Sequence, residues 1–279
     1  MGTDRELERI YQKVDRAFQQ FLAERSEIRR VEQIMNREVI TIDENDSLLT
    51  AAKMMGENKI GSLVVIREKK AWGLVIDTDL IKVLAEGKDL ADIRIKDGMS
   101  IPLISIMPKD TIAEAAKMMI LRGGELVVFG GGTLVGVIFT SDIIKSLPEC
   151  PETNLKIDDF MSQEIVSLDE SASAIEAIKL MGDENVGSII VTRSGKPHSI
   201  FTDGDLFFYY FTKENALSDP IQNAVSPPLK IIPAGTTIHK TAYIMSKEKV
   251  KRLLVVKDDK LVGIITARDL IRAYAELAS

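Results

Sequence analysis

Two pairs of polar residues occupy matching places in the sequence, each directly before an apolar helical pattern. Thr202 with Asp205, and Thr266 with Asp269, share the spacing Thr-x-x-Asp. A carboxylate can accept hydrogen bonds from two neighbouring hydroxyl groups, and the free amides of a helix N-terminus favour phosphate oxygens. The same spacing is close to that of a capping box, in which the side chains satisfy only the helix start. The two interpretations are compatible, because a capped helix start can still present its side chains.

Two further aspartates stand at the equivalent place without the threonine. Asp79 and Asp142 precede Asp205 in steps of ~63 residues, and Ile76 and Phe139 replace the threonine. We therefore expect weaker ligand contacts at Asp79 and Asp142 than at the two complete pairs.

These aspartates belong to a fourfold internal repeat. The segment Ala-Ala-Lys-Met-Met at 51–55 recurs at 115–119 and, in degenerate form, at 177–181 and 241–245. Each copy combines a short strand, a helix with an i, i+3, i+4, i+7 apolar stripe, two strands joined by a turn, and a second helix. The pattern predicts an α/β (α+β) fold of four β-α-β-β-α units.

The prolines at 148 and 151 mark the clearest internal boundary. A single unit buries little apolar surface alone, so we expect two modules, 30–147 and 155–276, each closing one core from two neighbouring repeats. The predicted repeats span 30–90, 91–147, 155–215 and 216–276. Residues 1–29 predict an amphipathic helix that either docks on the first module or contacts a partner.

Composition narrows the class of protein further. The chain of 279 residues is 45% apolar and 28% charged, which is typical of an ordered globular protein. Its net charge is −6 without a dense basic face, so nucleic acid is not an expected partner. One cysteine, no apolar run of membrane length and no signal-peptide core together predict a cytoplasmic protein without membrane contact. The two histidines have no ligand cluster around them, so no metal site is expected.

Two local patterns, a glycine triplet and an aromatic run, predict structural roles. The three glycines at 130–132 precede a strand rather than a helix and lack a following Lys-Ser/Thr, so they predict a hairpin turn and not a phosphate loop. The aromatic run 206–211 falls on the second helix of repeat three. It is more aromatic than a core stripe needs, and we expect part of it to face the other module or a partner.

The end of repeat four resembles the signature end of a CBS domain, in the segments 252–256 and 263–270. The methionine at 35 followed by the strand 39–42 resembles that domain's start. Four copies in register strengthen the likeness, which covers everything except the N-terminal helix. Tandem pairs of this family are called Bateman modules, and four-repeat members include the gamma subunit of AMP-activated protein kinase and its prokaryotic relatives. The resemblance implies two modules in a disc-like assembly that bind adenosine-containing ligands.

The resemblance also implies roles for particular residues. In the family, the Thr-x-x-Asp element contacts ribose and phosphate, and the strand position shared by Thr41, Ser105 and Ser167 touches the base or ribose; repeat four has Ile231 there. Basic residues that could meet phosphates gather in repeat four, although they could equally solvate a helix end. The predicted ligand-binding set is Thr202, Asp205, Thr266, Arg268, Asp269, Ser167, Arg252, Lys249, Asp79, Asp142, Thr41 and Ser105.

The function implied is regulatory. We expect a protein that binds AMP, ADP or ATP, with Mg²⁺ accompanying ATP and no other cofactor, and passes ligand occupancy to an unidentified protein partner. It would be a monomeric disc or a homodimer, with the second module the better nucleotide site. The alternative is an interaction scaffold that binds S-adenosylmethionine, nucleic acid or no ligand. No nucleophile–base–orienter set recurs in the sequence, so no catalytic residues are predicted.

Overall fold

The computed structural model describes residues 30–99, 103–122, 124–147, 153–213, 215–225 and 229–277. The predicted N-terminal helix at 1–29 and the prolines at 148 and 151 lie outside the described residues. The chain divides into two compact units. Among the described residues, unit 1 contains 30–37, Ile104–Glu164 and 230–277, and unit 2 contains Glu38–Leu103 and Ile165–Leu229.

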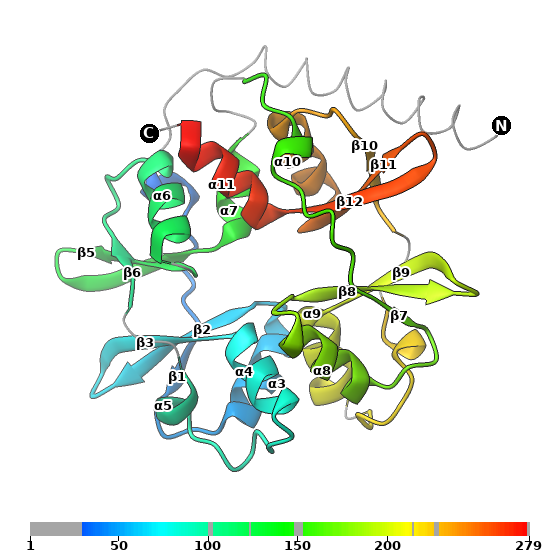
Figure 1. Ribbon diagram of the computed structural model, residues 1–279. Helices are drawn as coiled ribbons and strands as arrows, with labels where there is room; N and C mark the ends of the chain where they lie inside the picture. Colours follow the sequence, from blue (N-terminus) through cyan, green and yellow to red (C-terminus); the bar gives the residue numbers. More distant parts are fainter. Residues whose placement is uncertain are drawn as a thin grey trace. The chain divides into compact units, whose positions relative to one another are not determined.

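Unit 2 is built from repeats one and three (Figure 1). The elements of repeat one are β1 (Thr41–Asp43), α3 (Leu48–Asn58), β2 (Ser62–Arg67), β3 (Lys70–Ile76) and α4 (Asp77–Ala85), followed by α5 (Ile95–Gly98). Those of repeat three are β7 (Ser167–Asp169), α8 (Ala174–Asp183), β8 (Ser188–Arg193), β9 (Lys196–Thr202), α9 (Asp203–Leu206) and the π-helix η3 (Phe207–Thr212), followed by the 3₁₀-helix η4 (Ile221–Asn223).

Unit 1 is built from repeats two and four. It begins with α2 (Val31–Ile34), and repeat two contributes β4 (Ser105–Ile106), α6 (Ile112–Arg122), β5 (Leu126–Gly130), β6 (Thr133–Ile138) and α7 (Thr140–Ser146). After the 3₁₀-helix η2 (Ile157–Asp159), repeat four contributes β10 (Ile231–Pro233), α10 (Ile238–Glu248), β11 (Arg252–Lys257), β12 (Lys260–Thr266) and α11 (Ala267–Leu277).

The four repeats share one sheet topology. In each, the first strand runs parallel to the second across the intervening helix, and the second pairs antiparallel with the third. The third strand follows a two-residue turn whose central residues both have positive φ, as at Gly131 (59°) and Gly132 (82°). Such turns match the right-handed twist of the flanking strands. The predicted fold class and the hairpin turn at 130–132 are both confirmed.

The hydrophobic cores join alternate repeats, which corrects the prediction of one core within each pair of neighbours. One core combines side chains of repeats one and three, including Leu48, Met55 and Phe207, and the other combines repeats two and four. In unit 2, α3 packs on η3 and α4 on α8; in unit 1, α6 packs on α11 and α7 on α10. The sequence shows four similar apolar helix faces, and their periodicity does not specify which of them meet.

Neighbouring repeats are nevertheless linked, because each repeat's leading segment packs on its neighbour. Asn36 and Val137 exchange two backbone hydrogen bonds of 2.9 Å, and Ser162 and Ile264 exchange two of 3.0 and 2.9 Å. The leading segment of repeat one therefore extends a sheet edge of repeat two, and that of repeat three extends an edge of repeat four. In unit 2, an isolated antiparallel bridge joins Arg94 to Ser47, the N-cap residue of α3.

Candidate functional site

The first Thr-x-x-Asp pair closes the start of α9. Thr202 is the N-cap residue, and its hydroxyl donates to Asp205 Oδ2 at 2.7 Å while accepting from the Asp205 amide at 3.2 Å. The Thr202 amide donates to the same Oδ2 at 3.0 Å. Asp205 is buried, with 8% of its surface exposed. The capping interpretation is thus correct for this pair, and the cap holds both side chains in fixed orientations at the strand end.

The second pair has the same geometry at the start of α11. The Thr266 hydroxyl donates to Asp269 Oδ2 at 2.6 Å, and the Thr266 amide donates to that oxygen at 2.9 Å. The Arg272 guanidinium lies 3.6 Å from the other carboxylate oxygen, Oδ1. Asp269 is half-buried, so this carboxylate is more accessible than that of Asp205.

The incomplete pairs keep the carboxylate in place and lose the hydroxyl. The Ile76 amide donates to Asp79 Oδ2 at 3.1 Å, and the Phe139 amide donates to Asp142 Oδ2 at 3.0 Å. All four aspartates therefore occupy the same backbone position. The repeats differ in whether a threonine hydroxyl or an apolar side chain stands beside the carboxylate.

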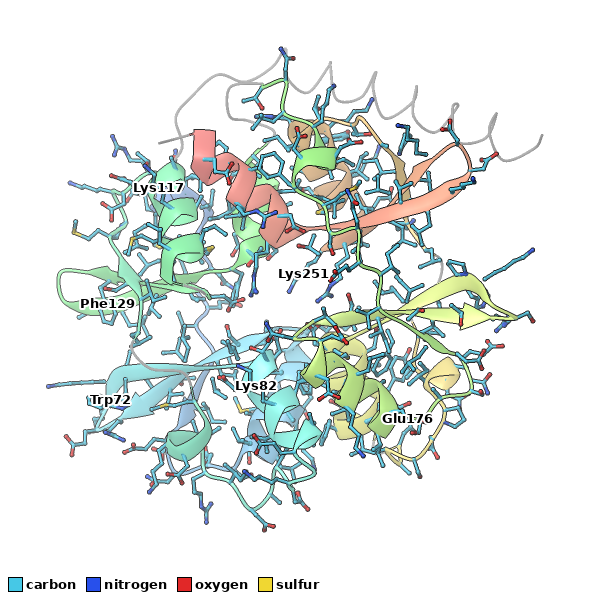
Figure 2. All side chains as sticks on the ribbon, viewed as in Figure 1. Trp72, Lys82, Lys117, Phe129, Glu176 and Lys251 are labelled. Atoms are coloured by element: carbon cyan, nitrogen blue, oxygen red, sulfur yellow. The ribbon has the colours of Figure 1, made fainter. Side chains whose placement is uncertain are left out.

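Strand pairing brings the basic residues of repeat four to its Thr-x-x-Asp element. Arg252 lies directly opposite Thr266 in the β11–β12 ladder, and the Ala267 amide donates to the Lys251 carbonyl at 2.8 Å. Figure 2 labels Lys251, which directly precedes β11. Arg268 is exposed in the first turn of α11. Within the part of the chain that the structure describes, no carboxylate forms an ion pair with Arg268.

The remaining basic residues near this element have mixed roles. Lys249 is the exposed C-cap residue of α10, in a left-handed conformation with φ 54°. Lys230 pairs with Glu248 at 2.8 Å, and Lys247 lies 5.8 Å from the centre of the Tyr243 ring. Lys247 and Lys249 therefore lie at the C-terminal end of α10, as the helix-end interpretation expects, whereas Arg252 and Arg268 are placed beside Thr266.

The strand position predicted to face the ligand lies at the same sheet end. Thr41, Ser105 and Ser167 are the exposed first residues of β1, β4 and β7. In repeat three, Ser167 pairs with Ile190, two residues beyond Ser188, which itself lies opposite Thr202. The first strand, the segment before the second strand and the end of the third strand thus converge within each repeat. In repeat four, Ile231 is 41% exposed and supplies an apolar surface there.

Two aspartates at this end of the repeats were not predicted as site residues. Asp77 and Asp203 occupy the first positions of α4 and α9, and each accepts the amide of the next residue at 2.7 Å. Thr140 and Ala267 hold the matching positions in unit 1. The sequence signal was the motif Asp-x-Asp in repeats one and three. It makes the helix starts of unit 2 more acidic than those of unit 1.

Neither a metal centre nor a membrane segment is found in the described residues. No group of three or more His, Cys, Asp or Glu side chains among them is arranged to hold a metal ion. None of the described helices has the length and apolar character needed to cross a membrane.

Comparison with known families identifies the repeats. Residues 31–86, 90–149, 157–211 and 221–276 each match the CBS domain family. The chain therefore belongs to the CBS domain family and contains four CBS domains in tandem, as the sequence resemblance predicted.

Two archaeal proteins match long stretches of the sequence. The uncharacterized protein MJ1404 of Methanocaldococcus jannaschii is 22% identical over 88% of this chain, and the chain spans 62% of that protein's length. MJ1225 of the same organism is 25% identical over 64% of this chain and 69% of its own length. The chain thus spans roughly two thirds of the length of these relatives.

Two solved structures match most of this chain. The crystal structure of MJ1225, described as a candidate archaeal homologue of g-AMPK, matches with a TM-score of 0.72 at 19% identity, covering 88% of this chain and 100% of that one. An uncharacterized conserved protein from Pyrococcus horikoshii matches with a TM-score of 0.61, at the same identity and coverage. At this identity the matches establish the fold.

Proposed function

We propose that the protein is a regulatory sensor that binds AMP, ADP or ATP through its third and fourth repeats. The observation that carries this proposal is the complete Thr-x-x-Asp element at the start of α11, with Arg252 opposite Thr266 and Arg268 in the adjoining turn. In each of the two repeats, ribose hydroxyls would donate to its own aspartate, Asp205 or Asp269. In repeat four, phosphate oxygens would accept from the two guanidinium groups.

The distribution of charge favours repeat four as the place for phosphates. Its helix start contains Ala267 where repeat three has Asp203, and its second strand begins with Arg252 where repeat three has Ser188. A carboxylate beside a phosphate is unfavourable, whereas a planar guanidinium binds phosphate oxygens in pairs. Ile231 at the neighbouring strand start offers apolar surface for a base.

A regulatory role agrees with the family, because CBS domain proteins are generally regulatory rather than catalytic. MJ1225, which shares the fold of this chain, is described as a candidate homologue of g-AMPK. The regulated partner, Mg²⁺ binding with ATP, the cytoplasmic location and the monomeric or homodimeric state stay predictions.

Calorimetry with AMP, ADP and ATP tests the proposal directly. We expect heat of binding for at least one nucleotide, and Asp269→Asn should weaken the affinity more than the matched change Asp79→Asn. Aspartate-to-asparagine substitution keeps the size of the side chain and one oxygen that can accept the cap hydrogen bonds, more weakly, while removing the charge. Absence of heat and of any thermal shift at millimolar nucleotide would refute the proposal. A larger loss of affinity for Asp79→Asn than for Asp269→Asn would move the site to repeat one.

S-Adenosylmethionine is a second candidate, favoured by repeat one. There Ile76 replaces the threonine, and Asp77 and Asp79 open α4. An apolar side chain and two carboxylates suit a cationic sulfonium nucleoside better than a phosphate. Competition between S-adenosylmethionine and AMP separates the two cases, because Ile76→Thr should weaken the former and leave AMP binding at repeat four unchanged.

A further inference from the structure

One helix of unit 2 runs from the Thr202–Asp205 cap into a widened turn. α9 continues directly into the π-helix η3, where the Lys213 amide donates to the Phe208 carbonyl, five residues earlier, at 3.1 Å. The Thr212 hydroxyl donates to the Phe207 carbonyl at 3.3 Å. The corresponding helices α4, α7 and α11 of the other repeats are α-helical. Single π turns are rare and frequently stand at functional sites.

The π turn packs against a glycine of repeat one. A Cβ atom added to Gly56 in α3 would lie only 2.6 Å from the Phe207 carbonyl oxygen and would also overlap Thr212 Oγ1. Any larger residue at 56 would therefore push η3 away from α3. The close approach of two backbones makes the position of α3 dependent on the register of η3.

The contact continues toward the Asp79 element of repeat one. Lys59 caps α3 in a left-handed conformation, and its Nζ lies 5.7 Å from the centre of the Phe208 ring, with Lys213 Nζ at 5.3 Å. Two residues later, the Gly61 carbonyl accepts the Asp77 amide at 2.8 Å. The segment 59–62 thus joins η3 to the start of α4.

We propose that η3 is a two-state element that couples ligand occupancy at Thr202 and Asp205 to the conformation of the segment 59–62 in repeat one. Conversion of the π turn to α-helical register would rotate the N-terminal end of η3, with Phe207 and Phe208, by about 100° around the helix axis relative to the residues that follow η3. Phe208 would then leave Lys59, and the Phe207 carbonyl would leave Gly56. This coupling rests on the proposed nucleotide binding at repeat three.

The physical condition for coupling is that a ligand binds the two registers with different affinity. Thr202 and Asp205 meet that condition, because they are the N-cap and N3 residues of the helix that changes register. A ligand held by both would restrain the first turn of the helix, and the π turn that directly follows would respond. Unit 1 lacks the device, because its helix α11 is regular and faces α6, which has Ile120 at the position of Gly56.

Hydrogen exchange measured by mass spectrometry on the full chain tests this coupling. With saturating AMP, amides in 203–213 and in 54–62 of the wild-type protein should exchange severalfold more slowly. Gly56→Ala should abolish the response at 54–62. Gly182→Ala is the matched control in the same unit, since its Cβ would meet Ala85 Cβ at 2.5 Å, away from η3. Thr212→Val removes only the hydroxyl contact and serves if Gly56→Ala fails to fold.

The outcomes separate the coupling from the binding. If calorimetry shows AMP binding and 54–62 does not respond, or if Gly182→Ala abolishes the response as fully as Gly56→Ala, the coupling is refuted while nucleotide binding stands. If no nucleotide binds, the ligand-free protein provides the test. Asp205→Asn, which weakens the cap of α9, should then alter exchange at 54–62, and Asp269→Asn should not; equal behaviour of the two variants refutes the coupling.

Discussion

Units 1 and 2 have the same fold and close it with different helix contacts. In unit 2, Gly56 and Gly182 let backbones approach, with Gly56 against the π turn and Gly182 against Ala85. The matching positions of unit 1 hold Ile120 and Ser246, and the facing helices stay α-helical. The comparison teaches that one repeat sequence tolerates two modes of helix packing, a close glycine-based one and an ordinary side-chain one.

The units also differ in charge at the strand ends. Unit 2 opens α4 and α9 with Asp77 and Asp203, whereas unit 1 has Thr140 and Ala267 at those positions and adds Arg252 and Arg268 in repeat four. Unit 1 therefore offers the better surroundings for phosphate. Unit 2 offers the helix pair through which occupancy at one repeat would reach another.

Swapping the helix-packing residues between the two units should change the free energy of unfolding more than any other substitution considered. Gly56→Ile, which gives α3 the residue of α6, should lower the free energy of unfolding by about 3 kcal/mol, because a buried backbone contact cannot absorb the added atoms. Denaturant unfolding monitored by circular dichroism measures this loss. The matched change Ser246→Ile, at a partly exposed position of α10, should cost less. Equal losses would show that the close packing of unit 2 contributes nothing special.

Swapping the charged residues at the strand ends between repeats should have an intermediate effect, on the affinity for ATP. Arg252→Ser, which gives repeat four the residue of repeat three, should weaken ATP binding by about tenfold, the usual consequence of losing one charge-assisted hydrogen bond. Calorimetry at two salt concentrations measures it, and the salt dependence should fall as well. Lys257→Ser, at the far end of the same strand, is the control. Unchanged affinity for Arg252→Ser would place the phosphates elsewhere.

Swapping the threonine of the Thr-x-x-Asp element for an apolar residue, or the reverse, should have the smallest effect, on stability. Thr266→Val removes the hydroxyl bond to Asp269 and the cap of α11, which should cost about 1 kcal/mol of stability. Ile76→Thr should add the equivalent hydroxyl bond to Asp79. This bond should partly offset the stability lost with the buried apolar surface of Ile76. Thermal unfolding of the two variants measures both changes. A neutral Thr266→Val would mean that the hydroxyl stabilises only the bound state.

Much of the site was predictable because it is local in sequence. Thr266 and Asp269 are three residues apart, so a helix start places them together whatever the rest of the chain does. The aromatic run 206–211 indicated a contact beyond its own repeat, and Phe207 indeed packs on Gly56 of repeat one. The π turn itself was not predictable, since no local residue pattern distinguishes an i→i+5 from an i→i+4 turn in an aromatic helix.

The sequence by itself determined the repeat, the order of strands and helices and the residue types of the turns, because each depends on residues close together in the chain. Only the tertiary structure decided which repeats share a core. Four similar amphipathic helix faces could pair in several ways, and the choice depends on side-chain volume at positions such as Gly56 and Gly182. The position of Arg252 opposite Thr266 depends on the register of the β11–β12 hairpin, which its turn and the bulge at Val255 and Val256 set together.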